Sequence, residues 1–213
     1  MPYRDERGIA IGFGDAGEAL EARYTAGEDA ASGGSVIAAP HPLYGGSIDS
    51  PVVEEIAFGF RQAGLATLSF NWRGVGASAG QPSGEPEHAD EDYAAALEHL
   101  IESVSMPIIA SGYSFGAAAA IRASRNRAAV RRLVLVAPPP SLIDRAALEA
   151  FTRPVLAIVG ESDSLARAAE LEAIVAALPQ GKLEVVPEAD HFFGVGLGTI
   201  SRAISSWLAD SAG

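Results

Sequence analysis

The chain has 213 residues, of which 48% are hydrophobic and 20% charged, and its formal net charge is −12. This composition suffices for a large buried core and argues against a disordered chain, and the length favours a single domain over residues 1–213. The acidic surface argues against nucleic acid and against an anionic membrane as partners, because like charges repel.

The chain contains no cysteine, which excludes disulfides, thiolate zinc sites and a cysteine nucleophile. The first residues do not form a signal peptide, and no apolar run approaches the roughly 18 residues of a membrane span. We therefore expect a cytoplasmic protein, a monomer or a homodimer, that needs neither a metal nor a cofactor.

Two short strands open the predicted fold. They span Gly8–Phe13 and Ala19–Tyr24 with no helix between them, so we expect an antiparallel hairpin at one edge of the sheet. The Gly/Ala/Ser-rich stretch Ala26–Ser35 is predicted to be a hairpin turn. Gln81–Glu87 is predicted to be a surface loop, because its prolines and glycine interrupt regular structure.

After the hairpin, predicted strands and helices alternate. Short apolar runs typical of strands buried on both faces occur at Val36–Ala39, Leu65–Phe70, Pro107–Ala110, Leu133–Val136, Val155–Val159 and Leu183–Val186. Helical patterns occur at Val52–Ala63, Ala89–Ser103, Phe115–Ser124, Leu165–Leu178 and Thr199–Ala209. The alternation predicts an α/β fold, with a mostly parallel sheet of about eight strands and helices on both faces. Ligands of such sheets bind beyond the carboxyl ends of the strands.

The pattern G-x-S-x-G occurs twice, around Ser78 and around Ser114. A nucleophile elbow of this pattern needs a strand before the serine and a helix after it. Ser114 follows an apolar run and precedes an alanine-rich helical segment, whereas Ser78 lies between glycine-rich loops. We therefore assign Ser114 as the nucleophile and Ser78 as a loop serine. Gly112 and Gly116 avoid side-chain clashes where strand and helix approach closely.

A serine nucleophile needs a base, and the base needs an acid that orients it. In hydrolases with this elbow the acid follows the serine in the chain and the histidine comes last. His191 follows the last predicted strand, and we assign it as the base. Glu161 and Asp163 share the preceding loop. We prefer Asp163 as the acid because it lies farther past the strand end, and Glu161 is the alternative.

The remaining candidates near this site have other expected roles. His41 borders the site but precedes the serine, which is the wrong order for the base, and His88 and His99 lie in a loop and a helical stretch. Asp190 adjoins His191 and is expected to stabilise its loop.

The segment 39–46 follows a predicted strand and is expected to complete an oxyanion hole. In this architecture the loop supplies one backbone N–H, and the residue after the nucleophile supplies the other. Phe115 is the second donor. Leu43 is our choice for the first and Tyr44 the alternative, since Pro42 has no N–H.

At these residues the chain resembles the α/β-hydrolase superfamily, and more narrowly the small bacterial hydrolases related to dienelactone hydrolase. The matching pieces are PHPLYGG (40–46), NWRGVGASAG (71–80), GYSFGA (112–117), GESD (160–163) and ADHFF (189–193). The resemblance implies that residues 71–74 form a structural loop beside the site, with Arg73 tying loops together. Dienelactone hydrolases use a cysteine nucleophile, so Ser114 favours ordinary ester or thioester hydrolysis instead.

Many members of the superfamily insert a cap where this chain has only Ala137–Arg153, which is enough for a short helix near Leu142–Ala150. We expect no cap domain, a shallow open site and hydrolysis of short-chain carboxylic esters. Peptidase, amidase or thioesterase activity, or a non-catalytic binding role, are the alternatives. Possible substrate-lining residues, which could equally belong to the core, are His41, Tyr44, Trp72, Tyr113, Phe115, Phe192 and Phe193.

Overall fold

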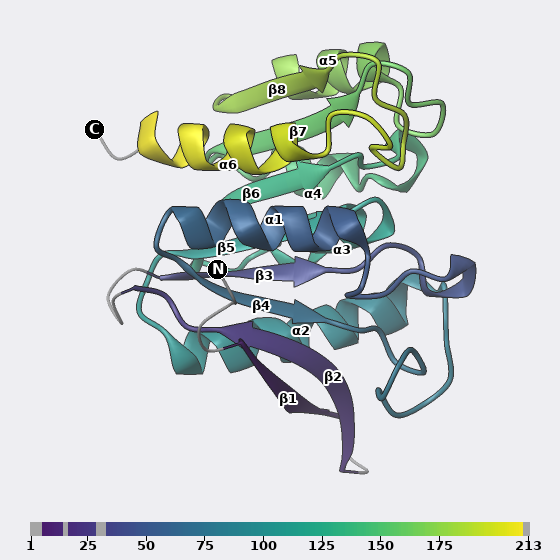
Figure 1. Ribbon diagram of the computed structural model, residues 1–213, viewed down its shortest axis with the longest axis vertical. Coiled ribbons are helices and arrows are strands. Elements are labelled where there is room, and N and C mark those ends of the chain that lie inside the picture. The colour runs from purple at the N-terminus through teal and green to yellow at the C-terminus, as the bar shows by residue number, and fades with distance from the viewer. Residues whose placement is uncertain (1–5, 15–16, 29–32, 211–213) are drawn as a thin grey trace.

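One eight-stranded sheet organises the computed structural model, which describes residues 6–14, 17–28 and 33–210 (Figure 1). The strands are β1 (Glu6–Phe13), β2 (Glu18–Thr25), β3 (Gly34–Ala38), β4 (Ala66–Phe70), β5 (Ile108–Tyr113), β6 (Val130–Val136), β7 (Val155–Gly160) and β8 (Gly181–Val186). The helices are α1 (Pro51–Gln62), α2 (Pro86–Ser103), α3 (Phe115–Ala123), α4 (Arg145–Glu149), α5 (Ala168–Ala176) and α6 (Gly198–Asp210). Two short 3-10 turns, η1 (Pro42–Tyr44) and η2 (Pro140–Leu142), complete the described elements.

The first two strands form the expected antiparallel hairpin at one edge of the sheet, with Ile9 opposite Ala22. The interpretation of Ala26–Ser35 as a second hairpin turn is wrong. The strands β2 and β3 on either side of it do not pair, because β4 lies between them and pairs with both. The stretch instead carries the chain past β4 into the interior of the sheet, and its residues 29–32 lie outside the described part.

The strand order is β1-β2-β4-β3-β5-β6-β7-β8, and from β4 onward all neighbours are parallel. The chain leaves β3 through α1 to reach β4 on one side, then returns through α2 to β5 on the other side. The carboxyl ends of β3 and β5 therefore flank a topological switch point, where open α/β sheets bind ligands. In Figure 1 the parallel strands point to the right, toward the loops that follow them.

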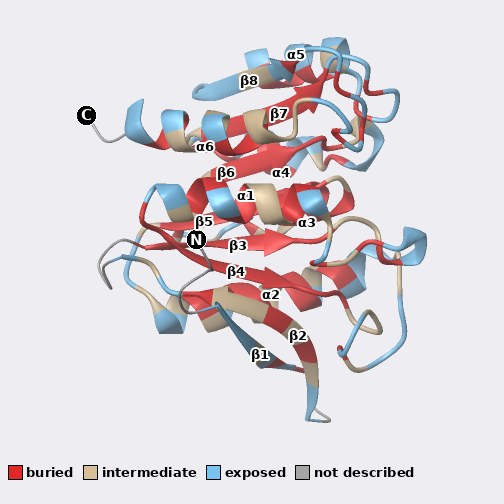
Figure 2. Cartoon of the chain, in the orientation of Figure 1, coloured by how far each residue is buried: buried red, intermediate tan, exposed pale blue. Residues whose placement is uncertain are grey.

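Helices cover both faces of the sheet, as predicted. α1 and α6 pack together on the face toward the viewer in Figure 1, and α2 and α3 pack together on the opposite face. Figure 2 shows the central strands buried along their length, while the two edges are more exposed. The last strand, β8, differs from the expectation of burial on both faces, because at the sheet edge it has only β7 as a neighbour.

Two helices, α5 and α2, begin three residues away from the start that the sequence predicts. α5 begins at Ala168 rather than Leu165, because the N–H groups of Leu165 and Ala166 donate to a side-chain oxygen of Asp163 in a tight turn. α2 begins at Pro86, inside the stretch predicted as a loop, since proline is well suited to the first helical position, where its missing N–H costs nothing.

The connection between β6 and β7 contains only η2 and the short helix α4. The described residues therefore form no cap domain, as expected, and the carboxyl ends of the central strands stay uncovered on this side. Within the described part of the chain, no helix combines the length and the hydropathy that crossing a bilayer requires.

Candidate active site

Ser114 occupies a strained turn between β5 and α3. Its backbone has φ 55° and ψ −115°, a conformation that residues other than glycine rarely adopt, and its N–H donates to the carbonyl oxygen of Val136 at 2.8 Å. A Cβ atom at Gly112 would lie 2.4 Å from the backbone of Gly116, and one at Gly116 would lie 2.4 Å from the carbonyl oxygen of Ala38. Both glycines are thus required by close packing, and the turn presents the serine hydroxyl beyond the sheet.

Ser114, His191 and Asp163 form a hydrogen-bonded chain, although they come from three separate loops. The His191 Nε2 atom lies 3.0 Å from the Ser114 hydroxyl, and the His191 Nδ1 atom lies 2.7 Å from the Asp163 carboxylate. Asp163 and His191 are buried, whereas Ser114 is half-buried. The arrangement can pass a proton from the serine to a ring nitrogen whose opposite side is held by a carboxylate.

The Asp163 carboxylate has enough partners to stay ionised. Burial alone would raise its pKa, but the hydrogen bonds from His191 and from the N–H groups of Ala166 and Leu165 outweigh that effect, so its pKa lies below the usual value. A negative charge beside the His191 ring stabilises the imidazolium form.

Glu161 and Asp163, the two carboxylates of the loop after β7, have different partners in the structure. Glu161 is exposed, and its side chain accepts a hydrogen bond from the N–H of Glu188 at 2.9 Å, which ties the acid loop to the histidine loop. Asp190 accepts from the N–H groups of Phe192 and Gly194, the loop-stabilising role expected of it. The Tyr113 hydroxyl donates to the carbonyl oxygen of His191 at 2.9 Å and fixes the same loop from below.

His41 caps the turn η1 that follows β3. Its Nδ1 atom accepts a hydrogen bond from the N–H of Leu43 at 3.2 Å, while the N–H of Tyr44 bonds the carbonyl oxygen of His41. Burial lowers the pKa of His41, which favours the uncharged ring that this hydrogen bond needs. The ring lies between those of Tyr44 and Phe115, and a Cβ atom at Gly84 would come within 2.8 Å of it.

The two backbone donors expected for an oxyanion differ in their engagement. As the first residue of α3, Phe115 has an N–H with no acceptor inside the helix. The Leu43 N–H donates to the His41 ring at 3.2 Å and the Tyr44 N–H donates to the carbonyl oxygen of His41 at 3.1 Å, so both are already engaged. The choice of Leu43 over Tyr44 stays a prediction.

Two of the aromatic residues expected to line the site belong to the core instead. Trp72 is buried, and its indole N–H donates to the carbonyl oxygens of Ala39 and Pro40, at 2.9 and 3.0 Å. Phe193, at φ 53°, is also buried, while the preceding Phe192 is largely exposed beside Ser114. The expectation that they line the site is therefore wrong.

A cavity of about 540 Å³ opens beside Ser114. Its wall consists of Pro40, His41, Tyr44, Gly45, Gly46, Ser50, Pro51, Val52, Tyr113, Ser114, Leu165, His191 and Phe192. His41, Tyr44, Tyr113 and Phe192 are thus placed as expected. The volume falls in the range of about 300–1,000 Å³ that is typical of ligand cavities, so there is more room beside Ser114 than expected, while the shallowness of the site stays a prediction.

Sequence reasoning missed part of this wall. Val52 was expected only as the start of a helix and Leu165 as the first turn of another, and Ser50 and Pro51 were given no role. A signal existed for Leu165, which stands two residues after the acid at a strand end. The Phe115 side chain lies against a second cavity, of about 320 Å³, which His41 separates from the first.

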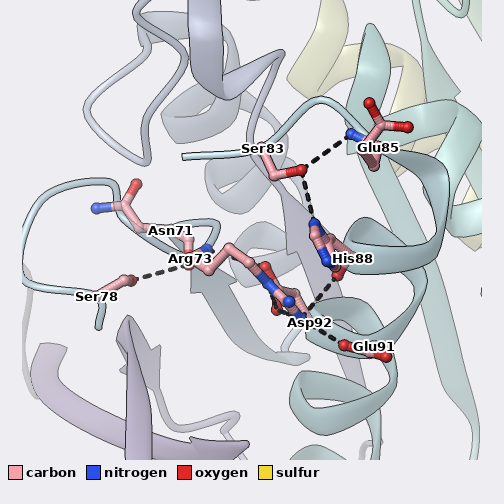
Figure 3. A network of polar contacts seen from close by, with 8 residues as sticks. All are labelled: Asn71, Arg73, Ser78, Ser83, Glu85, His88, Glu91 and Asp92. Carbon is pink, nitrogen blue, oxygen red and sulfur yellow. Dashed lines mark hydrogen bonds and ion pairs between the residues drawn. The ribbon is translucent and has the colours of Figure 1, made fainter. Parts of the chain in front are cut away.

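Arg73 ties the loop after β4 to the helix α2, whereas the sequence resemblance implies that it ties loops together. Figure 3 shows its guanidinium between Asp92 and Glu91, and its Nε and Nη2 atoms lie 2.9 and 2.7 Å from the Asp92 carboxylate. The loop held in this way contains both Trp72, which binds the carbonyls before His41, and Gly84, which abuts the His41 ring. The network therefore supports residues 39–46, the segment expected to complete an oxyanion hole.

Residues 45–147 match the family described as serine aminopeptidase, S33. An uncharacterized protein of Rickettsia prowazekii is 27% identical over 201 residues, which are 89% of this chain and 84% of that protein. The solved structure of an alpha-beta serine hydrolase homologue from Coxiella burnetii is 26% identical with a TM-score of 0.81, covering 98% of this chain and 99% of that one. A serine hydrolase without lid from Xanthomonas campestris, 24% identical over 98% of this chain and 95% of that one, has the same fold with a TM-score of 0.80.

Proposed function

Because the chain belongs to the α/β-hydrolase superfamily, we propose that this serine hydrolase cleaves carboxylic esters through an acyl-enzyme on Ser114. The observation that carries the proposal is the hydrogen-bonded chain from Ser114 through His191 to Asp163 at the edge of an open cavity. The strained backbone of Ser114 argues against a purely binding role, which would not need a serine in that geometry.

In the first half of the reaction, the Ser114 hydroxyl gives its proton to His191 Nε2 and attacks the ester carbonyl carbon. The negative charge that develops on the carbonyl oxygen is stabilised by the N–H groups of Phe115 and Leu43, and the Asp163 carboxylate stabilises the imidazolium. When the intermediate collapses, the bond to the alcohol oxygen breaks, and His191 Nε2 gives the proton to the leaving alcohol.

In the second half, a water molecule gives a proton to His191 Nε2 and attacks the acyl carbon on Ser114. Collapse of this second intermediate breaks the bond to the serine oxygen, and His191 returns the proton to Ser114. The carboxylic acid leaves, and the three side chains regain their starting protonation.

The cavity favours an ester over a peptide N-terminus as the substrate. An aminopeptidase must bind the positive α-ammonium group of its substrate, for which a carboxylate is the usual partner. The cavity wall formed by the described residues contains no Asp or Glu side chain. We therefore expect uncharged esters to be better substrates than amino-acid amides.

The reaction class can be tested with substrates that share a butyryl group: p-nitrophenyl butyrate, a butyryl thioester and butyryl p-nitroanilide, with alanine p-nitroanilide as the aminopeptidase substrate. We expect kcat/KM for the ester to exceed that for either anilide by at least about 100-fold, because the amide nitrogen is a poorer leaving group. Comparable turnover of alanine p-nitroanilide would assign the protein to the aminopeptidases, and faster turnover of the thioester to the thioesterases.

Trp72→Phe should lower kcat about 10- to 100-fold with little change in KM. The change keeps an aromatic ring beside Phe115 but removes the N–H that binds the Ala39 and Pro40 carbonyls, so the oxyanion loop loses its anchor. Steady-state kinetics and the Tm of the variant are the measurements.

The matched control is Trp207→Phe, which changes a buried tryptophan on α6, away from the cavity wall. It should lower the Tm without changing kcat. Equal effects of the two variants on kcat would mean that Trp72 acts only through overall stability.

A further inference from the structure

Exposed apolar side chains gather at the mouth of the cavity beside Ser114. Tyr44, Leu165 and Phe192 line this cavity, yet 87%, 57% and 71% of their surface is open to solvent, and we call these three the apolar collar. They come from three loops: the expected oxyanion loop (39–46), the loop that contains Asp163 (161–167) and the loop that contains His191 (187–197). Leu43 and Val195, on two of the same loops, are exposed as well.

The collar needs an explanation, because the rest of the surface is strongly acidic. The net charge is −12, and among the described residues only nine large apolar side chains are exposed, five of them on these three loops. Apolar side chains concentrated around a cavity mark a binding surface more often than a chance exposure.

The cavity behind the collar is apolar along most of its wall. The part of the wall between Ser114 and the start of α1 is formed by Pro40, Gly46, Pro51 and Val52. Among the described residues of this part, Ser50 is the one with a polar side chain. A volume of about 540 Å³ is much more than an acetyl or butyryl group fills.

We propose that the preferred substrate carries an extended apolar group, of at least about six carbons, that runs from the scissile ester through this cavity to the apolar collar. The proposal rests on the ester hydrolysis proposed above and names its substrate class. It differs from the short-chain preference expected from the missing cap, because the three loops enclose a volume of about 540 Å³ without one.

The test is kcat/KM along two series of esters below their micelle-forming concentrations. One series lengthens the acyl group, from p-nitrophenyl acetate to octanoate, and the other lengthens the alcohol, from ethyl to octyl acetate. A methylene that leaves water gains roughly fourfold in kcat/KM at full burial, so we expect a rise of about two- to fourfold per methylene in at least one series, up to six carbons or more. A flat or falling profile in both series would overturn the proposal.

Variants of the apolar collar test whether the rise of kcat/KM with chain length comes from contact with these side chains. Tyr44→Ser and Phe192→Ser should each lower the ratio of kcat/KM for the long ester to that for the short one by about fivefold or more, since each removes a ring from the path. Both side chains are exposed, so the Tm should change little. Val185→Ser, at an exposed position on β8 outside the cavity wall, is the control and should keep the wild-type ratio.

An unchanged ratio in both collar variants would overturn the proposal even if the chain-length series rises. Failure of ester hydrolysis itself has a different signature, namely no turnover of any ester in either series.

Discussion

Ser114→Ala is expected to lower kcat for a p-nitrophenyl ester by at least about 10⁴-fold and to abolish labelling by a fluorophosphonate. In the proposed mechanism the serine oxygen bonds to the acyl carbon, and the His191 Nε2 atom, 3.0 Å away, accepts its proton. Without the hydroxyl, only the oxyanion donors and substrate binding remain, and they leave a small residual acceleration over water. Purified wild-type and variant proteins are compared in steady-state assays, with mass spectrometry to locate the label.

The control for this experiment is Ser78→Ala, in the other copy of the G-x-S-x-G pattern. The Ser78 hydroxyl accepts from the N–H of Glu21 at 2.8 Å and donates to the carbonyl oxygen of Asn71 at 3.1 Å, so it is a structural serine. Its loss should cost about 1–3 kcal/mol of stability and leave kcat close to wild type. A label on any residue other than Ser114, or an active Ser114→Ala protein, would show that the nucleophile is assigned wrongly.

Asp163→Asn is expected to lower kcat about 10⁴-fold while the protein still folds. The amide has nearly the shape of the carboxylate, but it lacks the charge that stabilises the His191 imidazolium, and its NH2 group can favour the wrong tautomer of the ring. Burial of Asp163 and its two backbone hydrogen bonds keep the position fixed, so the loss should fall on kcat rather than on KM.

Glu161→Gln tests the specificity of that result, because it makes the same carboxylate-to-amide change two residues away. The Glu161 side chain accepts from the N–H of Glu188, and the carbonyl oxygen of a glutamine can accept the same bond. We expect less than about a threefold change in kcat. A large loss in Glu161→Gln with a small loss in Asp163→Asn would move the role of the acid to Glu161.

Much of the fold was predictable because its signals are local. Short apolar runs alternate with helical patterns, and a strand, a G-x-S-x-G turn and a helix follow one another around Ser114. The hairpin of β1 and β2 was also predictable, since no helix separates the two strands. Errors occurred where pairing is non-local. The position of β4 between β2 and β3 depends on packing in the whole sheet, and no pattern in residues 26–35 predicts it.

The candidate site divides in the same way. The order of Ser114, Asp163 and His191, each beyond the end of a strand, was visible in the sequence, and the structure brings the three side chains together. Their catalytic roles remain predictions. Which of two neighbouring aromatic residues faces the cavity was not visible, because Phe192 and Phe193 have the same chemistry and only the backbone of their turn separates them.

The sequence by itself determined most of the strands and helices, the serine turn and the three candidate residues at the strand ends, since each depends on a pattern a few residues long. Only the tertiary structure decided the volume and the apolar wall of the cavity. That wall forms where the loop from Pro40 to Val52 meets Leu165 and Phe192, more than a hundred residues farther along the chain. A surface made by three loops that are distant in the sequence depends on how their backbones pack on the folded sheet. No local pattern of residues predicts this packing.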